Sequence, residues 1–171
     1  MLRRTFVILA LMPLTGGCQK PPLQEFTSTE YKFKASFPGI PRRENKTGAL
    51  GTKFAVYGTS TEDGICKVEI AEVEIPDDAS DALVEDWVEG AVKAAIRDYE
   101  PSLKGRSRVV LSGKFPGREF LAGINKPFKG EMRGRIYLVN KRLYQVIVIG
   151  SGSYASSDHA SQFLDSFQLI P

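Results

Sequence analysis

The fold of this chain is decided by residues 130–149, which read GEMRGRIYLVNKRLYQVIVI. Two runs within it, Gly130 to Val139 and Leu143 to Ile149, are rich in the β-branched and aromatic residues typical of β-strands. Between them lies Asn140-Lys141-Arg142, and asparagine tolerates the positive backbone angle that a tight turn needs. The stretch therefore predicts an antiparallel β-hairpin.

Further strands are expected on both sides of this hairpin, where the sequence alternates between apolar and polar residues. They cover residues 31–37, 52–60, 64–75, 107–112 and 118–124, with a short last strand near 168–170.

Three local patterns refine this assignment. Thr61-Glu62-Asp63 and Pro116-Gly117 are turn signals that predict two more hairpins. Residues 42–51 are polar and contain glycine, which predicts a loop. After Ile70 the apolar positions shift by one residue, which predicts a β-bulge or the end of strand pairing there.

Two segments have helical spacing. Over residues 79–98 apolar side chains recur three and four positions apart, Asp78 or Ser80 can cap the start, and Trp87 is interpreted as a core anchor. A shorter capped helix is expected over residues 156–167. Strands, a long helix, strands and a short helix in this order predict an α+β fold. We expect an antiparallel β-sheet packed against one long helix and one short C-terminal helix.

The N-terminal residues have the pattern of a secretory signal. Two arginines precede an apolar run, residues 6–12, that is far shorter than the roughly 20 residues of a membrane-spanning helix. The run Leu14-Thr15-Gly16-Gly17-Cys18 resembles the lipobox of bacterial lipoproteins. That resemblance implies cleavage before Cys18 and acylation of its sulfur and its new amino group. Gln19 stands where an aspartate often signals inner-membrane retention, so the resemblance implies the outer membrane, facing the periplasm.

These features divide the chain into three parts. Residues 1–17 are the predicted signal peptide, residues 18–25 a proline-containing tether, and residues 26–171 a single α+β domain. Two prolines favour an extended tether of roughly 20 Å, which would keep the domain close to the membrane. Around Cys66, apolar and charged residues alternate, which places Cys66 on the apolar side of a strand. A buried core thiol is therefore favoured over a redox centre.

Several segments of the sequence resemble the PsbP-like family of small α+β domains. They are Phe33 to Pro41, Gly113 to Phe120, Arg135 to Val139 with Arg142 to Val146, and Phe163 to Phe167. PsbP is an extrinsic subunit of photosystem II, and other members are adaptors or are uncharacterised. The resemblance implies a binding or supporting role more than catalysis, but a fold alone does not fix a function. No residue matches a known site motif of the family, so neither a photosystem role nor an ion site is carried over.

A search for catalytic chemistry finds little. His159 is the single histidine, and a hydrolase built on Asp158 and His159 is the weakest alternative. One histidine and one buried cysteine cannot form a zinc site, and phosphate-binding or dinucleotide motifs are absent. We therefore expect no metal, no cofactor and no enzymatic activity. A second alternative is a carrier that holds a small apolar ligand between sheet and long helix, beside Trp87.

Charge is segregated along the chain. Residues 62–100 hold 13 acidic and 3 basic side chains, whereas residues 101–149 hold 11 basic and 2 acidic ones. Two interpretations remain open, with the second preferred. In the first, basic side chains form a binding patch that contains Arg133, Arg135, Tyr137 and Arg142. In the second, the basic strands neutralise the acidic helix internally. The basic segment lacks the interleaved aromatics expected for nucleic-acid binding.

These observations predict a membrane-anchored lipoprotein of the cell envelope. Its attachment would be the lipid on Cys18, and its partner another envelope protein that the domain binds or supports without catalysis.

Overall fold

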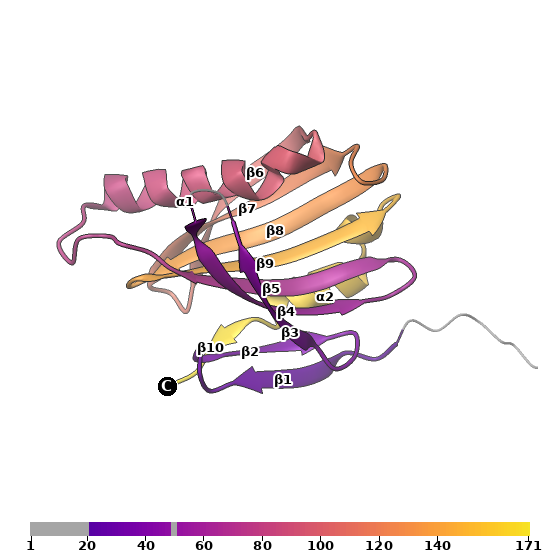
Figure 1. Cartoon of the computed structure of the whole chain (residues 1–171), viewed down its shortest axis with the longest axis horizontal. Helices are drawn as coiled ribbons and strands as arrows, with labels where there is room; N and C mark the ends of the chain where they lie inside the picture. Colours follow the sequence, from indigo (N-terminus) through magenta and orange to yellow (C-terminus); the bar gives the residue numbers. More distant parts are fainter. Residues whose placement is uncertain (1–20, 49–50) are drawn as a thin grey trace, which may run out of the picture.

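The main sheet is antiparallel and has seven strands in the order β3-β4-β5-β9-β8-β7-β6 (Figure 1). The structure, a computed structural model, describes residues 21–48 and 51–171. The predicted signal peptide and Cys18 lie outside these residues. The strands of this sheet are β3 (Arg42–Thr47), β4 (Lys53–Ser60), β5 (Gly64–Glu72), β6 (Ser102–Leu111), β7 (Phe115–Ile124), β8 (Gly130–Val139) and β9 (Arg142–Ser151).

The hairpin predicted from residues 130–149 is confirmed and lies near the middle of the sheet. Strands β8 and β9 pair from Val139 and Arg142 to Gly130 and Ser151, and Asn140 in the turn has a positive φ of 53°. Strand β9 is buried along nearly its whole length on both faces, which explains its almost unbroken apolar sequence.

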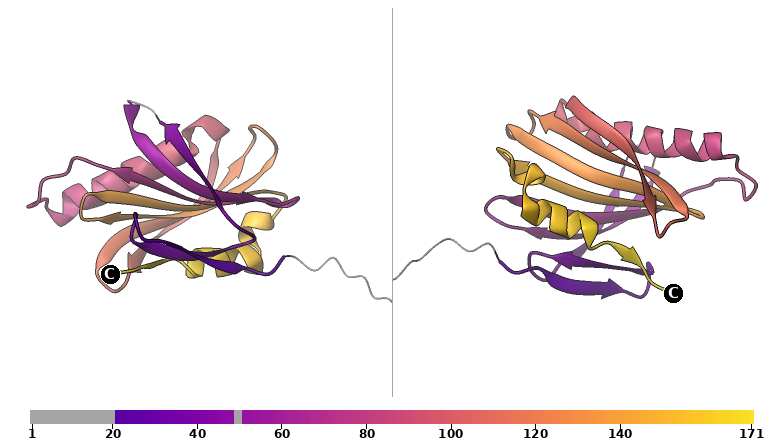
Figure 2. Two further views of the ribbon diagram at one scale, coloured as in Figure 1. Left: turned by 60° about the horizontal axis from the view of Figure 1, so that its bottom comes forward. Right: turned by 180° about the vertical axis from the view of Figure 1, so that it is seen from behind.

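Each face of the main sheet has its own cover. Helix α1 (Asp81–Ile96) packs on β7 and β8, and the side chain of Ser80 caps it by accepting a hydrogen bond from the Leu83 amide. The opposite face carries α2 (Asp158–Asp165) and a small sheet in the order β1-β2-β10 (Figure 2). Its strands are β1 (Gln24–Ser28), β2 (Phe33–Phe37) and β10 (Gln168–Leu169). The predicted α+β fold is therefore confirmed.

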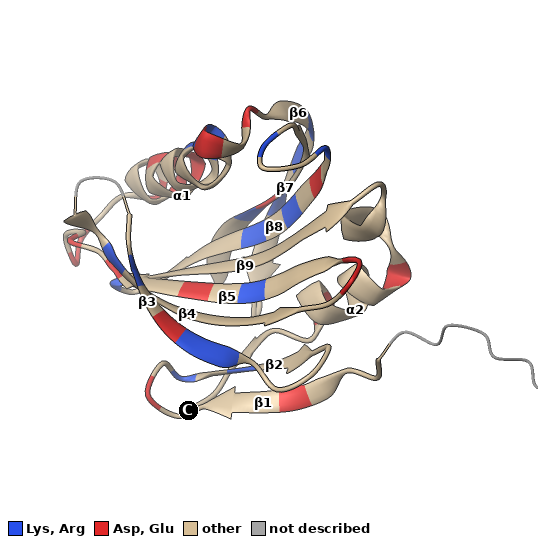
Figure 3. Cartoon of the chain, turned by 45° about the vertical axis from the view of Figure 1, so that its right-hand side comes forward, with Lys and Arg blue, Asp and Glu red and all other residues tan. Residues whose placement is uncertain are grey.

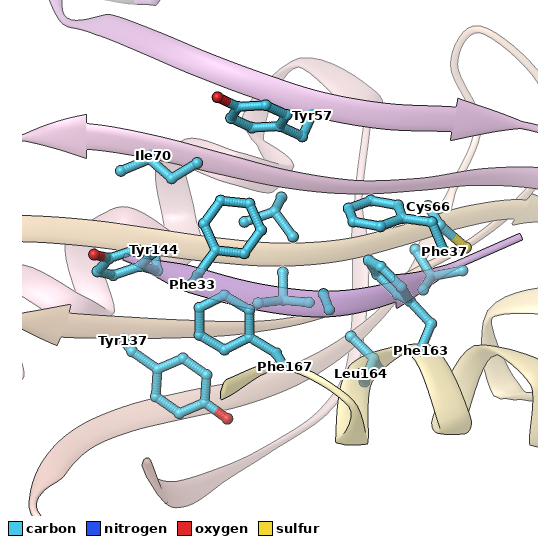
Figure 4. Close-up of a cluster of buried hydrophobic side chains, with 14 of the residues drawn as sticks. Phe33, Phe37, Tyr57, Cys66, Ile70, Tyr137, Tyr144, Phe163, Leu164 and Phe167 are labelled. Carbon is cyan, nitrogen blue, oxygen red and sulfur yellow. The ribbon is translucent and has the colours of Figure 1, made fainter. Parts of the chain in front are cut away.

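Aromatic rings join the small sheet to the main sheet. Phe167 stacks on Phe33 with ring centroids 5.7 Å apart and on Tyr137 with centroids 6.1 Å apart. Phe37 contacts Phe163 of α2 at 5.1 Å (Figure 4). Such ring pairs contribute about 0.5–1.5 kcal/mol beyond the area they bury. The C-terminal segment after α2 therefore completes this core by packing between the small sheet and the main sheet.

Two sequence predictions about strands were wrong. Residues 42–47 were expected in a loop but form β3, whose side chains are all exposed because it is an edge strand with no buried face. The turn between β6 and β7 lies at Ser112 and Gly113, both with positive φ, and Pro116-Gly117 already belongs to β7. Near Ile70 the second alternative holds, because no bulge forms and pairing ends at Ala71 with β4 and at Glu72 with β9.

The shift in apolar positions at Ile70 also reflects two separate cores. Ile70 belongs to the core under α2 and the small sheet, whereas Ile75, beyond the strand, belongs to the core under α1. Burial on two faces hides the period of two that a half-exposed strand would show.

Trp87 was predicted as a core anchor, and this was wrong. Its side chain is 36% exposed, because it lies on the flank of α1. The buried residues of the helix are Val88, Ala91, Val92 and Ile96. Small and β-branched side chains therefore let the helix approach the sheet closely, and the indole is excluded from the interface.

Cys66 is the buried core thiol that the sequence predicted. It is fully buried on β5, with its sulfur 3.7 Å from the Tyr154 hydroxyl. Burial raises the pKa of the thiol to about 11, although the contact with Tyr154 lowers it somewhat. A thiol held protonated in this way is a poor nucleophile at neutral pH.

This pKa predicts a specific loss of stability in alkali. An unfolded cysteine ionises near pH 9.0, whereas the folded thiol stays protonated up to about 11. Ionisation therefore favours the unfolded chain as pH rises through this window. We expect the difference in unfolding free energy between wild type and Cys66→Ala to shift by up to about 2–3 kcal/mol from pH 9 to 11. Urea unfolding at both pH values measures it. A difference in unfolding free energy between the two proteins that is the same at pH 9 and pH 11 would contradict the prediction.

Candidate functional site

The molecule has two unlike ends. At the tether end, the backbone carbonyl of Pro21 accepts a hydrogen bond from His159 Nε2 at 3.1 Å. Strand registers place loops 38–41, 61–63 and 125–129 at this same end (Figure 1). The opposite, distal end carries the β8–β9 turn, the segment between β5 and α1, and the C-terminus. The chain therefore enters the domain at the end opposite to the β8–β9 turn.

A groove of about 1240 Å³ opens at the distal end. Five separate parts of the chain form it: the residue before β2, the segment after β5, the start of β7, the β8–β9 turn and the last strand. Its lining is Lys32, residues 72–77, Phe115, Val139, Asn140, Lys141, Arg142, Tyr144, Leu169 and Ile170. We call this site the distal groove.

The apolar wall of the distal groove is fixed by the core. Tyr144 is almost fully buried, and its hydroxyl donates a hydrogen bond to the Tyr31 carbonyl at 2.8 Å. Burial raises the pKa of Tyr144, so this donor stays protonated. Phe115, Val139 and Leu169 border the same aromatic core. The wall is therefore formed before any ligand arrives.

The rim of the distal groove carries both signs of charge. Lys141 Nζ lies 2.9 Å from Asp77, and Arg142 Nη2 lies 3.6 Å from Glu72. Lys32 Nζ donates to the carbonyl of Pro171 at 2.9 Å. Exposed pairs of this kind contribute less than about 1 kcal/mol each. A ligand with its own charges can therefore exchange partners with them at little cost.

The chemistry that this lining supports is binding. Among the described residues that form it, none is a serine, threonine, cysteine or histidine. The site therefore lacks the aliphatic hydroxyl, thiol and imidazole groups that most often serve as nucleophile and base, and its one phenolic hydroxyl, on Tyr144, donates to the Tyr31 carbonyl. An apolar wall with a charged rim suits a partner that presents both kinds of side chain.

The predicted patch residues divide between two places. Arg142 lines the distal groove. Arg133 and Arg135 share a face of β8 but are bound under α2, where both donate to Glu119. Tyr137 is buried against Phe167. The structure thus brings only one of the four to the groove, and the binding role of the others stays a prediction.

Glu119 explains why these two arginines are held. Burial alone would raise the pKa of this carboxyl, but hydrogen bonds from Arg135 and Arg133 outweigh burial and lower it. Arg133 also donates to Ser161 and Arg135 pairs with Asp165, both on α2. The arginines therefore attach α2 to the main sheet.

The acidic and basic segments neutralise each other across the helix–sheet interface. Arg118 of β7 bonds to Glu85 and Glu89 of α1 at 2.9 and 2.7 Å. In Figure 3 acidic residues (red) lie along α1 and basic residues (blue) along the strands beside it. Arg106 and Arg108 of β6 add pairs to the same two glutamates. Internal neutralisation, the preferred interpretation of the sequence, therefore describes these residues.

Sequence reasoning missed most of the distal groove. Lys32 carries a positive φ of 52°, yet nothing in its sequence neighbourhood indicates this. Ile75 and Asp77 follow a strand whose end the sequence did not locate. Groove residues that come from five segments have no common spacing, so only the tertiary structure brings them together.

The two alternative functions can be examined at their predicted positions. The ring nitrogens of His159 contact the Tyr154 hydroxyl and the Pro21 carbonyl, at 3.3 and 3.1 Å, and neither contact is with a serine. Around Val88, Phe120 and Met132 the space between α1 and the sheet is filled by packed side chains. A pocket of about 240 Å³ lies at the start of α1, beside Val84 and Leu138. It is smaller than the roughly 300–1,000 Å³ of most small-molecule sites.

The described residues contain neither a metal-binding cluster nor a membrane-spanning helix. Within residues 21–48 and 51–171, no three side chains of His, Cys, Asp and Glu cluster in a way that could hold a metal ion. In that same part of the chain, no helix combines the length and the apolar character needed to cross a bilayer.

The architecture is that of PsbP-like domains, an antiparallel α+β fold with two helices. The chain is similar to cyanobacterial PsbP, CyanoP, from Synechocystis sp. PCC 6803. The TM-score is 0.63, and the match covers 93% of this chain and 99% of that chain at 13% sequence identity. At this low sequence identity, the structural similarity shows a common fold. No family model and no curated protein sequence matches this chain.

The helix–sheet charge network gives a prediction for stability. Arg118 is only 8% exposed and bonds to Glu85 and Glu89, so its removal takes away their buried partner and leaves only the exposed Arg106 and Arg108 beside them. We expect Arg118→Ala to lower the free energy of unfolding by about 2–3 kcal/mol, measured in urea at pH 7. The control is Arg108→Ala, which removes a 74% exposed partner of Glu85 and should cost less than about 0.5 kcal/mol. Equal losses would contradict the prediction.

The same network predicts a pH dependence. Hydrogen bonding from Arg118 lowers the pKa of Glu89 below its ordinary value of 4.5. A lowered folded pKa gives stability that is present above pH 4.5 and is lost as pH falls. Wild type should therefore lose its advantage over Arg118→Ala as pH falls below about 4.5.

Proposed function

We propose that this protein is a membrane-anchored, non-catalytic binding module of the cell envelope, which holds a protein segment of another envelope component in the distal groove. The observation that carries the proposal is that the tether and the groove lie at opposite ends of the domain. A preformed groove lies at the end opposite to the tether. In an anchored protein, that end points away from the membrane surface and is the accessible one.

The anchor is supported by the sequence and by where the domain begins. The lipobox-like run ends at Cys18, and Pro21 already contacts the domain through His159. The three residues from Cys18 to Lys20 can span about 10 Å when extended. An acyl group on Cys18 would therefore hold the tether end beside the bilayer. Gln19 favours the outer membrane, and the periplasm as the compartment of the partner.

A protein segment suits the distal groove better than a small apolar molecule does. Small-molecule sites are mostly apolar and have volumes of about 300–1,000 Å³. The distal groove is larger, at about 1240 Å³, and its rim carries Lys32, Lys141 and Arg142 opposite Glu72, Glu74 and Asp77. Charges of both signs around an apolar wall match a polypeptide that alternates apolar and charged side chains.

The absence of catalysis in this proposal rests on two supports. PsbP-like domains are typically non-catalytic, and the groove lining holds none of the usual nucleophiles. The contacts of His159 are those of a side chain that fastens the tether to the domain.

Photocrosslinking of the full chain in its own envelope tests this function. A photoreactive amino acid at Lys141, on the groove rim, should give one recurrent protein adduct. The same amino acid at Val110, an exposed position on the β6 edge, is the matched control and should give none. Adding Arg142→Ala to the Lys141 form should lower the adduct yield several-fold, because it removes a rim charge.

The Cys18→Ala form tests the anchor in the same experiment. It should leave the membrane fraction and lose or scramble the adduct. Adducts that are equal at Lys141 and Val110, or absent from both, would contradict binding at the distal groove.

A further inference from the structure

The loop between β7 and β8 is unusual for its position and its side chains. It reads Asn125-Lys126-Pro127-Phe128-Lys129, and all five residues are exposed. Phe128 is 38% exposed, which is high for a phenylalanine in a domain that buries most of its aromatic residues. The fold does not use this ring as a core residue.

The loop lies at the tether end. Gly130, directly after it, pairs with Ser151 at the end of β9. From there contacts lead to the tether: Ser156 donates to Glu131 at 2.7 Å, and His159, one turn further on, bonds to Pro21. The loop and the point where the chain enters the domain therefore share one end of the molecule.

The composition of the loop fits the interface of a bilayer. The order of residues is lysine, proline, aromatic, lysine. An apolar ring therefore lies between two long, flexible and positively charged side chains. A phenylalanine ring can bury itself at the boundary between headgroups and acyl chains, and lysines reach anionic headgroups while their methylene chains lie along apolar surface. Lys126 pairs with Glu100, but both side chains are more than half exposed, so headgroup phosphates can compete for it.

Other charges at the tether end set the orientation. Glu62 and Asp63 lie in the β4–β5 turn, on the far side of β9 from this loop, and Asp158 begins α2. Anionic headgroups would repel these carboxylates. A domain held at this end should therefore tilt with the β7–β8 loop toward the bilayer. Ile40, 83% exposed in the β2–β3 loop, lies near Ser60 and Ile65 beside the acidic β4–β5 turn and would tilt away from the bilayer with it.

We propose that the β7–β8 loop is a second membrane contact, in which Phe128 enters the headgroup region of an anionic bilayer and Lys126 and Lys129 bind its phosphates. This inference rests on the proposed anchor at Cys18 and deepens it. One lipid attachment leaves the domain free to rotate, whereas a second contact fixes the distal groove to face away from the membrane.

The test places an environment-sensitive fluorophore on the loop of the full-length, lipidated protein. Phe128→Cys is labelled, since Cys66 is buried and an acylated Cys18 has no free thiol. The protein is placed in phosphatidylethanolamine–phosphatidylglycerol vesicles that contain a lipid with a nitroxide quencher on its acyl chain. Quenching should be several-fold stronger than for the same label on Val110→Cys at the distal end.

Charge-reversal variants test whether the two lysines of the loop contribute to the bilayer contact. Lys126→Glu combined with Lys129→Glu should lower quenching at position 128 several-fold, while Lys114→Glu in the β6–β7 turn, the matched control, should leave it unchanged. Equal quenching at positions 128 and 110, equal effects of the two charge variants, or a shielded label that lipid does not quench would overturn the inference.

The mass of the protein separates failure of this inference from failure of the anchor. A chain without acyl groups at Cys18 would take a second label and would overturn both the proposed anchor and the loop contact. A correctly acylated chain with a solvent-exposed loop would overturn the loop contact alone.

Discussion

The structure depends on one constraint, which is that strand β9 must be buried on both of its faces. Its residues alternate between the core under α1 and the core under α2 and the small sheet. A sheet with such a strand near its centre needs cover on each side, because exposed apolar faces are costly in water. The long helix covers one face, and α2 with the three-stranded sheet covers the other. The distal groove forms where the second cover meets the end of the main sheet.

Charge in this protein mainly holds the covers in place. Arg118 joins α1 to the sheet through Glu85 and Glu89, and Arg135 joins α2 to it through Asp165. The segregation of acidic and basic residues along the sequence is therefore a consequence of packing an acidic helix on basic strands. Weaker, exposed pairs lie around the distal groove, where we propose that recognition takes place.

The two ends of the domain have different roles in the function we propose. The tether end has Pro21 bound to His159 and exposes the lysines and aromatic ring of the β7–β8 loop. The distal end has a fixed wall at Tyr144 and a rim of exchangeable ion pairs. Attachment at one end and recognition at the other make a module that presents a partner at a set distance from a membrane.

The sequence by itself determined the α+β class, the β8–β9 hairpin and the buried state of Cys66, because each rests on local periodicity or turn chemistry that neighbouring residues carry. It could not assign β3, whose polar residues form a strand only because β4 pairs with it, or the exposure of Trp87, which depends on how closely α1 approaches the sheet. It could not find the distal groove either. Lys32, Asp77, Phe115 and Arg142 are far apart in the chain, and only the packing of two sheets brings them to one site.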